Sequence, residues 1–462
     1  MGEILKAYIV PHPPIIIPEI GKGEQNNASA TINAYEEIAR QIKELSPQTI
    51  IITTPHGTAY ADYIHILPGK KLSGSFKNFG APELSFEFEN DLELIESIKE
   101  NALTCGIEAG TLGAREKELD HGSLVPLYYI SKYFTDFSLI RISIAGLPLK
   151  QLYVFGSCIQ KAVTSSDKKV VFIGSGDLSH RLKEDGPYGF AEEGPAFDEF
   201  LVENIKAADF KKLLDIDERL CEQAGECGLR SFAMLAGALN GYRVKSKVLS
   251  YEGPFGVGYM IAELTLDGRD LSRDLISFYE ESHKHEIEAT RKAEDPYVTL
   301  ARTALENFVK KGKVIPVPDY LPEEMLNRKA GVFVSITKHG QLRGCIGTIS
   351  PVTDSIAEEI IQNAISSGTR DPRFNPVKDY ELKDLIYSVD VLGEPEPIKS
   401  IDELDVKRYG VIVSNGYRRG LLLPDLDGVD TPQQQVDIAL AKAGIGKNEE
   451  YSLERFEVVR HR

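Results

Sequence analysis

The chain has 462 residues, 42% of them hydrophobic and 27% charged, so it can bury more than one core and we expect two domains. Its formal net charge of −17 argues against nucleic acid or an anionic membrane as a general partner. Five scattered cysteines without a CxxC pair, no apolar run of ~18 residues and no secretory signal predict a cytoplasmic protein with no membrane partner.

The first part of the chain alternates strands and helices. Residues 5–10 (LKAYIV) are expected to form a buried strand that ends at Pro11, residues 31–45 an amphipathic helix, and residues 48–57 a second strand. Further strands are expected over 136–144, over 168–180 and at the start of 247–264, with a helix over 230–241. This alternation predicts a parallel α/β sheet, in which ligands bind beyond the carboxyl ends of the strands.

The composition changes after this α/β segment, where the chain becomes strongly charged and helix-prone. We therefore predict a first domain over residues 1–267, a charged helical connector over 268–290 and a second domain over 291–462.

Four of the nine histidines lie in the first domain beside glycine, proline or aspartate: His12 (PHPP), His56 (TPHG), His121 (DHGS) and His180 (DLSH). A single histidine of this kind is more often a surface or structural residue, but four in one α/β domain favour a metal or proton-transfer site. Neutral imidazoles suit iron, zinc and copper, and a carboxylate completes a facial triad with open positions. The prolines around His12 fix the direction in which it points. The spacing of these residues in the sequence does not identify the metal, and a zinc hydrolase could use the same residues.

In this order, the PHPP, TPH, DHGSLVPL and GSGDLSH segments resemble the class III extradiol dioxygenases of the LigB type and the related Memo proteins, across residues 1–265. The resemblance implies that His12 and His56 bind ferrous iron, and that a catechol-like or other small chelating molecule and dioxygen are the substrates. It gives His180 the acid/base role and places His121 near substrate and dioxygen. Memo relatives keep these histidines without an established ring cleavage, so a metal-binding role without dioxygenase chemistry is an alternative.

The resemblance also implies a carboxylate ligand, for which Glu252 in SYEGPFGVG is the best match. Asp177, Asp120 and Glu226 are the alternatives, and the structural interpretation of Glu252 is an exposed turn residue. Two cysteines in CEQAGEC, Cys221 and Cys227, are six residues apart and do not share a helical face, so we interpret them as packing or free thiols.

The second domain contains LRGCIG within residues 340–351 and DPRF within residues 367–377, which resemble the AMMECR-type family over residues 290–462. The resemblance implies a smaller α+β domain whose reaction is unknown. Its candidate site residues are Arg343, Cys345, Asp371 and Arg373, because a thiol beside glycines permits close approach and the charged groups can form a network. The alternative for Cys345 is a structural turn with a buried thiol. The fusion of the two families implies a radical S-adenosylmethionine protein as partner, and a homo-oligomer stays open.

Overall fold

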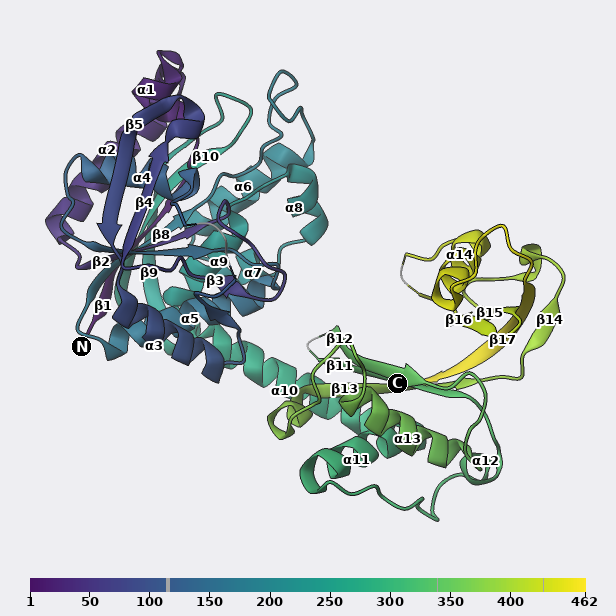
Figure 1. Cartoon of the computed structure of the whole chain (residues 1–462). Coiled ribbons are helices and arrows are strands. Elements are labelled where there is room, and N and C mark those ends of the chain that lie inside the picture. Colours follow the sequence, from purple (N-terminus) through teal and green to yellow (C-terminus); the bar gives the residue numbers. More distant parts are fainter. Residues whose placement is uncertain (114–116, 339, 427) are drawn as a thin grey trace. The chain divides into compact units, whose positions relative to one another are not determined.

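The computed structural model describes residues 1–113, 117–338, 340–426 and 428–462. The chain divides into two compact units, Met1–Phe278 and Tyr279–Arg462 (Figure 1). Within the described residues, no helix combines the length and the apolar character that crossing a bilayer requires.

The first unit is organised around a sheet with the strand order β7-β2-β8-β1-β10-β9. The strands are β1 (Glu3–Val10), β2 (Thr49–Thr54), β7 (Ser138–Ser143), β8 (Lys169–Ser175), β9 (Tyr242–Glu252) and β10 (Tyr259–Arg269). Neighbours from β7 to β1 pair in parallel, whereas β10 pairs antiparallel with β1 and with β9. All six residues of β2 are buried, as expected for a central strand covered on both faces. The mostly parallel α/β sheet predicted for the first domain is confirmed.

Helices cover both faces of this sheet. The helices of the first unit are α1 (Pro18–Gly21), α2 (Ser29–Leu45), α3 (Leu92–Thr104), α4 (His121–Ser131), α5 (Leu149–Ser165), α6 (Glu193–Lys206), α7 (Phe210–Leu214), α8 (Glu218–Ala224) and α9 (Leu229–Ala238). Tyr35 of α2 and Tyr129 of α4 stack in one core with Val10 and Ile52. Gly174 lies against α9, so α9 covers the opposite face. This two-sided cover leaves the carboxyl edge of the strands as the place where polar groups gather.

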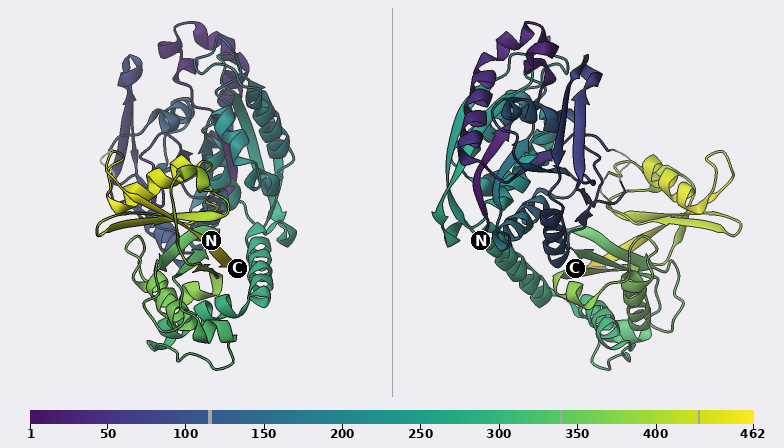
Figure 2. Two further views of the ribbon diagram at one scale, coloured as in Figure 1. Left: turned by 90° about the vertical axis from the view of Figure 1, so that its right-hand side faces the viewer. Right: turned by 60° about the vertical axis from the view of Figure 1, so that its left-hand side comes forward.

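Two small ribbons accompany the sheet. A parallel pair is formed by β3 (Ile64–His65) and β6 (Ala109–Gly110), and an antiparallel hairpin by β4 (Lys71–Phe76) and β5 (Ala81–Glu89). The hairpin projects as a separate ribbon in both views of Figure 2. Its turn carries Phe79, whose ring lies 5.3 Å from the ring of His121. The hairpin therefore brings an aromatic side chain to the carboxyl edge of the main sheet.

The second unit is built on an antiparallel sheet with the order β12-β11-β13-β17-β15-β16, and β14 pairs with β17. Its strands are β11 (Val332–Lys338), β12 (Gln341–Gly347), β13 (Leu385–Leu392), β14 (Glu396–Ile398), β15 (Tyr409–Asn415), β16 (Arg418–Leu422) and β17 (Ser452–His461). Helix α10 (Leu275–Ala293) spans the boundary between the units, and α11 (Pro296–Lys311), α12 (Glu323–Asn327), α13 (Ile356–Thr369) and α14 (Pro432–Ala443) follow. One core lies under α11 and α13 and another under α14. The α+β class predicted for this domain is confirmed.

Candidate metal centre

Three neighbouring parallel strands deliver the central residues of the site. His12 lies two residues beyond the end of β1, His56 two residues beyond β2, and Asp177 two residues beyond β8. Because β8 pairs in parallel with both β1 and β2, the three ends meet at one edge of the sheet. His121 arrives from another direction, as the first residue of α4. The expected meeting of His12, His56 and His121 is observed.

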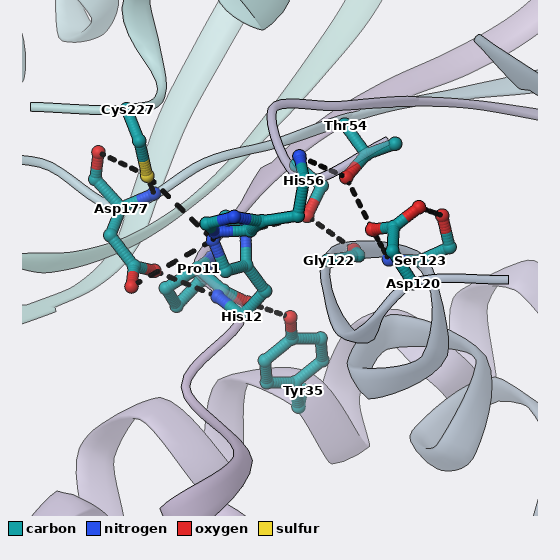
Figure 3. Close-up of polar contacts among 11 residues, drawn as sticks. Pro11, His12, Tyr35, Thr54, His56, Asp120, Gly122, Ser123, Asp177 and Cys227 are labelled. Carbon is teal, nitrogen blue, oxygen red and sulfur yellow. Dashed lines mark hydrogen bonds and ion pairs between the residues drawn. The ribbon is translucent and has the colours of Figure 1, made fainter. Parts of the chain in front are cut away.

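The backbone around His12 is held on both sides. The hydroxyl of Tyr35 donates to the carbonyl oxygen of Pro11, and the backbone N–H of His12 donates to Oδ1 of Asp177 at 2.8 Å (Figure 3). Because the His12 residue is only 1% exposed, its side chain has little freedom to turn away from the site. Together with the prolines of PHPP, these contacts fix the orientation of the His12 side chain.

Hydrogen bonding also fixes the tautomer of His12. Nδ1 of His12 lies 3.0 Å from the hydroxyl oxygen of Ser175, and that hydroxyl donates its own proton to the carbonyl oxygen of Gly122 at 2.6 Å. Since the Ser175 proton is already committed, Nδ1 of His12 must be the protonated nitrogen and donate to Ser175. Nε2 of His12 then carries a lone pair directed into the site, as a metal ligand requires.

The histidine side chains form one cluster. Nε2 of His56 lies 2.9 Å from Nε2 of His12, and the ring of His121 stacks on the ring of His56 with centroids 4.1 Å apart. His180 interacts electrostatically with His12 and His56, and its ring lies 5.1 Å from that of Tyr188. Its Nε2 is buried and has no hydrogen-bond partner among the described residues. The structure thus brings all four predicted histidines to one edge of the sheet.

Burial keeps these imidazoles neutral. Burial, and then the mutual repulsion of the other imidazolium groups, lowers the pKa of His12 well below its usual range. Burial likewise lowers the pKa of His56, although the negative charge of Asp120 acts to raise it. The pKa of His121 and that of His180 each fall to about 4, chiefly through burial and then through His56. Neutral imidazoles with free lone pairs are the form that binds a metal ion.

A carboxylate and a thiol complete the cluster. Oδ2 of Asp177 lies 4.0 Å from Nε2 of His12, and Sγ of Cys227 lies 3.6 Å from the same nitrogen. Burial raises the pKa of Asp177 to about 7, although the N–H of His12 opposes this shift. Potential ligand atoms fall into two groups in the described residues: His12, His56 and Cys227, and Asp177, His180 and Cys227. Cys227 is a free thiol, as expected, and its sulfur also lies in both groups of potential ligand atoms.

The other three candidate carboxylates lie at the N-termini of helices. Glu252 accepts from the backbone N–H and from the hydroxyl of Thr31 in the first turn of α2, each at 2.6 Å. Asp120 caps α4 through the N–H of Ser123, and Glu226 accepts from the N–H of Leu229 at the start of α9. Carboxylates satisfy the unpaired N–H groups at such positions. The structure therefore does not bring Glu252 into either ligand group, and the carboxylate that lies with the histidines is Asp177.

The residues fit a divalent metal ion. Ligand nitrogens bound ~2.1 Å from one ion lie about 3 Å apart when they are adjacent in an octahedral shell, close to the separation of the His12 and His56 nitrogens. The buried, unpaired Nε2 of His180 and the burial that raises the pKa of Asp177 are both features that a bound cation would compensate. A buried cluster of this kind is typical of functional sites.

A buried carboxylate anchors the turn that carries Asp177 and His180. Asp198 of α6 is fully buried and accepts from the N–H of Ser179 at 2.7 Å and from the hydroxyl of Tyr251 at 2.8 Å. Gly258 passes so close that a Cβ there would lie 2.0 Å from Oδ2 of Asp198. No local sequence pattern predicted the role of Asp198, because its two partners are 19 and 53 residues away along the chain.

Asp198 gives a pH-dependent prediction for stability. Burial raises its pKa to about 7, so the folded chain binds this proton more tightly than the unfolded chain. The protonated carboxyl therefore favours folding at low pH, and this contribution is lost as the pH rises from ~4 to ~7. The quantity to compare is the unfolding free energy of the wild type minus that of Asp198→Asn. We expect this difference to fall as the pH rises over this range, by at most about 1.4 kcal/mol per pH unit. Urea unfolding of both metal-free proteins measures this difference. A difference that does not change with pH contradicts the prediction.

The residues predicted for the second domain also come together. The backbone N–H of Cys345 donates to Oδ2 of Asp371 at 2.9 Å, and the guanidinium of Arg373 makes two bonds to the same carboxylate, at 3.0 and 2.7 Å. Arg343 instead pairs with Glu381 at 2.9 Å. Cys345 lies on strand β12, so the expected structural turn with a buried thiol is corrected to a half-buried residue on a strand.

Comparison with known proteins agrees with this architecture. Residues 6–262 match the model of the catalytic LigB subunit of aromatic ring-opening dioxygenase, and residues 298–461 match the AMMECR1 model. A protein of Clostridium acetobutylicum is 47% identical over 98% of this chain and 98% of its own. A protein of Thermotoga maritima is 50% identical over 37% of this chain and 98% of its own. The crystal structure of an uncharacterized protein from Pyrococcus horikoshii is 34% identical and covers 36% of this chain and 88% of that one, with a TM-score of 0.34. The chain therefore belongs to the family of the catalytic LigB subunits of aromatic ring-opening dioxygenases, joined to an AMMECR1 domain.

Proposed function

We propose that the first unit is a ferrous-iron-dependent dioxygenase of the extradiol type, acting on a catechol-like or other chelating molecule. The observation that carries the proposal is the pair of His12 and His56 nitrogens, 2.9 Å apart, with Asp177 beside them. Two imidazoles and one carboxylate are the ligands of non-haem iron sites that keep positions open for other molecules. Such an ion, when bound, supplies redox chemistry and a place where substrate and dioxygen meet.

The residues of the chain would then have separate tasks. His12, His56 and Asp177 would hold the ion, and the Ser175 and Gly122 bonds would keep Nε2 of His12 unprotonated. His180 is the proposed base for a substrate hydroxyl, because its neutral Nε2 is free of other partners among the described residues. His121 would orient the substrate, since its ring lies between His56 and Phe79.

A second candidate function is a metal-binding role without ring cleavage, in concert with a radical S-adenosylmethionine protein. The observation that favours it is Cys227, because a thiolate ligand suits zinc or cuprous copper better than it suits an oxygen-activating ferrous site. Metal-dependent hydrolysis could use the same ligands with zinc.

Oxygen uptake separates these functions. The chain is reconstituted anaerobically with ferrous iron and exposed to oxygen with a panel of catechols, with His180→Gln as the paired variant. The dioxygenase proposal expects uptake that depends on catechol and falls ~100-fold or more in the variant, as the loss of a general base does. An iron-loaded protein that consumes no oxygen, or that binds only zinc or copper, contradicts the proposal and supports the second function.

The choice of carboxylate is tested by two matched substitutions. Asp177→Asn is expected to lower the iron content of the reconstituted protein, because an amide is a poorer ligand for ferrous iron than a carboxylate. Glu252→Gln is expected to leave the iron content unchanged, because Glu252 serves the first turn of α2. Elemental analysis after desalting measures both. Loss of iron from Glu252→Gln alone would return the ligand role to Glu252.

A further inference from the structure

A buried arginine lies next to the turns that carry the histidines of the first unit. Arg141 stands on β7, opposite Ile52 of the neighbouring strand β2, and its side chain is completely shielded from solvent. Its guanidinium donates to the hydroxyl of Ser143 at 2.5 Å, and its Nε lies 3.4 Å from Oδ2 of Asp120. A buried ion pair is often no more stabilising than apolar side chains of the same volume, so stability alone does not account for this one.

The guanidinium lies directly against the turn that follows His56. The next residue is Gly57, and a Cβ on Gly57 would lie 2.3 Å from Nη1 of Arg141 and 2.4 Å from the hydroxyl oxygen of Ser143. There is therefore no room for a side chain between this turn and the guanidinium. The backbone after His56 keeps its present path only while Arg141 keeps its place.

Asp120 extends the contact to the backbone before His56. Oδ1 of Asp120 accepts from the hydroxyl of Thr54 at 2.6 Å, and the same hydroxyl oxygen accepts from the N–H of His56 at 3.2 Å (Figure 3). The other oxygen, Oδ2, is the one that faces Arg141. A continuous path of polar contacts thus runs from the guanidinium through Asp120 and Thr54 to the backbone of His56.

We propose that Arg141 is a positioning residue of the metal centre, which fixes the direction of His56 through Asp120. The inference rests on the metal centre of the proposed function, but not on the reaction that the ion supports. A guanidinium suits this task because its N–H donors lie in one rigid plane, so it can hold Ser143 and Asp120 and support Gly57 at the same time. Groups that orient a ligand without touching the ion typically change metal affinity 10–100-fold when they are lost.

Cobalt(II) is the probe for the test, because its visible absorption reports the geometry of its ligands and requires no dioxygen. The full chain is titrated with cobalt, and the signal that is lost in His12→Ala is the one that comes from the cluster. The main variant is Asp120→Asn, since asparagine caps a helix about as well as aspartate does while the ion pair with Arg141 is lost. We expect its cobalt affinity to fall about tenfold or more and its absorption spectrum to shift.

Asp91→Asn is the matched control. Asp91 caps α3 and accepts from the hydroxyl of Thr49 at 2.6 Å, so it makes at the start of β2 the contacts that Asp120 makes at the end of β2. Because the histidines gather at the other end of the strand, this variant should lower stability and leave the affinity and the spectrum of bound cobalt unchanged. The pair of variants therefore separates positioning of a ligand from support of the fold.

Arg141→Met completes a double-variant cycle. Removal of the guanidinium should also weaken cobalt binding and shift the spectrum, and it should have little further effect in the Asp120→Asn protein, because the two residues act as one pair. If Arg141→Met unfolds, Asp120→Asn alone decides the matter.

The proposal is overturned if folded Asp120→Asn keeps the wild-type affinity and spectrum, if Asp91→Asn changes them equally, or if the effects of Arg141→Met and Asp120→Asn are additive. A wild-type chain that binds no cobalt at the cluster contradicts the metal centre itself. A chain that shows the expected cobalt effects but takes up no oxygen with catechols contradicts the dioxygenase proposal and supports the role of Arg141.

Discussion

Replacing His12 with alanine is expected to reduce the metal content of the purified or reconstituted chain to background. Its Nε2 is the nitrogen that lies near His56, Asp177 and Cys227 together, so this side chain connects the two groups of ligand atoms. Loss of a residue that only supports a ligand typically weakens metal binding 10–100-fold, so loss of this ligand should weaken it by more than about 100-fold. Elemental analysis and a competition titration against a chelator measure the change.

The matched control is His285→Ala, which removes an exposed histidine on α10 and should leave metal content unchanged. His12→Ala also leaves a small cavity, so its folding is checked by circular dichroism and thermal unfolding. Unchanged metal content in a folded His12→Ala protein would show that the cluster is not the metal centre. Equal loss of metal in both variants would point to nonspecific binding by histidines.

Replacing Gly176 with valine is expected to damage both stability and the site. Gly176 follows β8 and touches the backbone of Gly228, where a Cβ on Gly176 would lie 2.1 Å from the Gly228 Cα. Asp177 and Cys227 are the direct neighbours of these glycines, and the N–H of Asp177 lies 3.3 Å from Sγ of Cys227. A side chain forced between two backbones must push these turns apart, which we expect to cost about 3 kcal/mol.

Urea unfolding of the metal-free protein measures the stability change, and a metal titration of the folded fraction measures the damage to the site. Gly446→Ala is the control, because the nearest atoms to a Cβ there are side-chain atoms of Glu449, at 3.2 Å or more, and not backbone atoms. It should change the unfolding free energy by less than about 1 kcal/mol. A Gly176→Val protein with wild-type stability and metal affinity would mean that the two turns do not depend on this close contact.

The sequence predicted the histidines of the site because each follows a recognisable local pattern. His12, His56 and His180 come after buried strands, and parallel strands bring their carboxyl ends to one edge. The same pattern predicted the mostly parallel sheet of the first unit, whereas the order of the strands in that sheet was not predicted. The hairpin of β4 and β5 was not predicted, although it brings Phe79 to His121.

The parts that could not be predicted depend on contacts between distant segments. Glu252 and Asp177 are both acidic residues next to glycine-rich turns, and only packing shows that Glu252 serves α2 while Asp177 faces His12. Cys227 was set aside because of its spacing from Cys221, whereas its place in the site depends on the contact between Gly176 and Gly228. Glycine directly after Cys227 was the one local signal of a close backbone approach.

We propose that the carboxyl edge of β1, β2 and β8 holds one metal ion. Anomalous diffraction at the iron edge, from crystals of the full chain reconstituted anaerobically with ferrous iron, tests this claim most directly. We expect one dominant peak within bonding distance, ~2.0–2.3 Å, of Nε2 of both His12 and His56, with Asp177 as the nearest carboxylate. The absence of an anomalous peak at these two nitrogens, or a dominant peak elsewhere in the chain, would contradict this metal site.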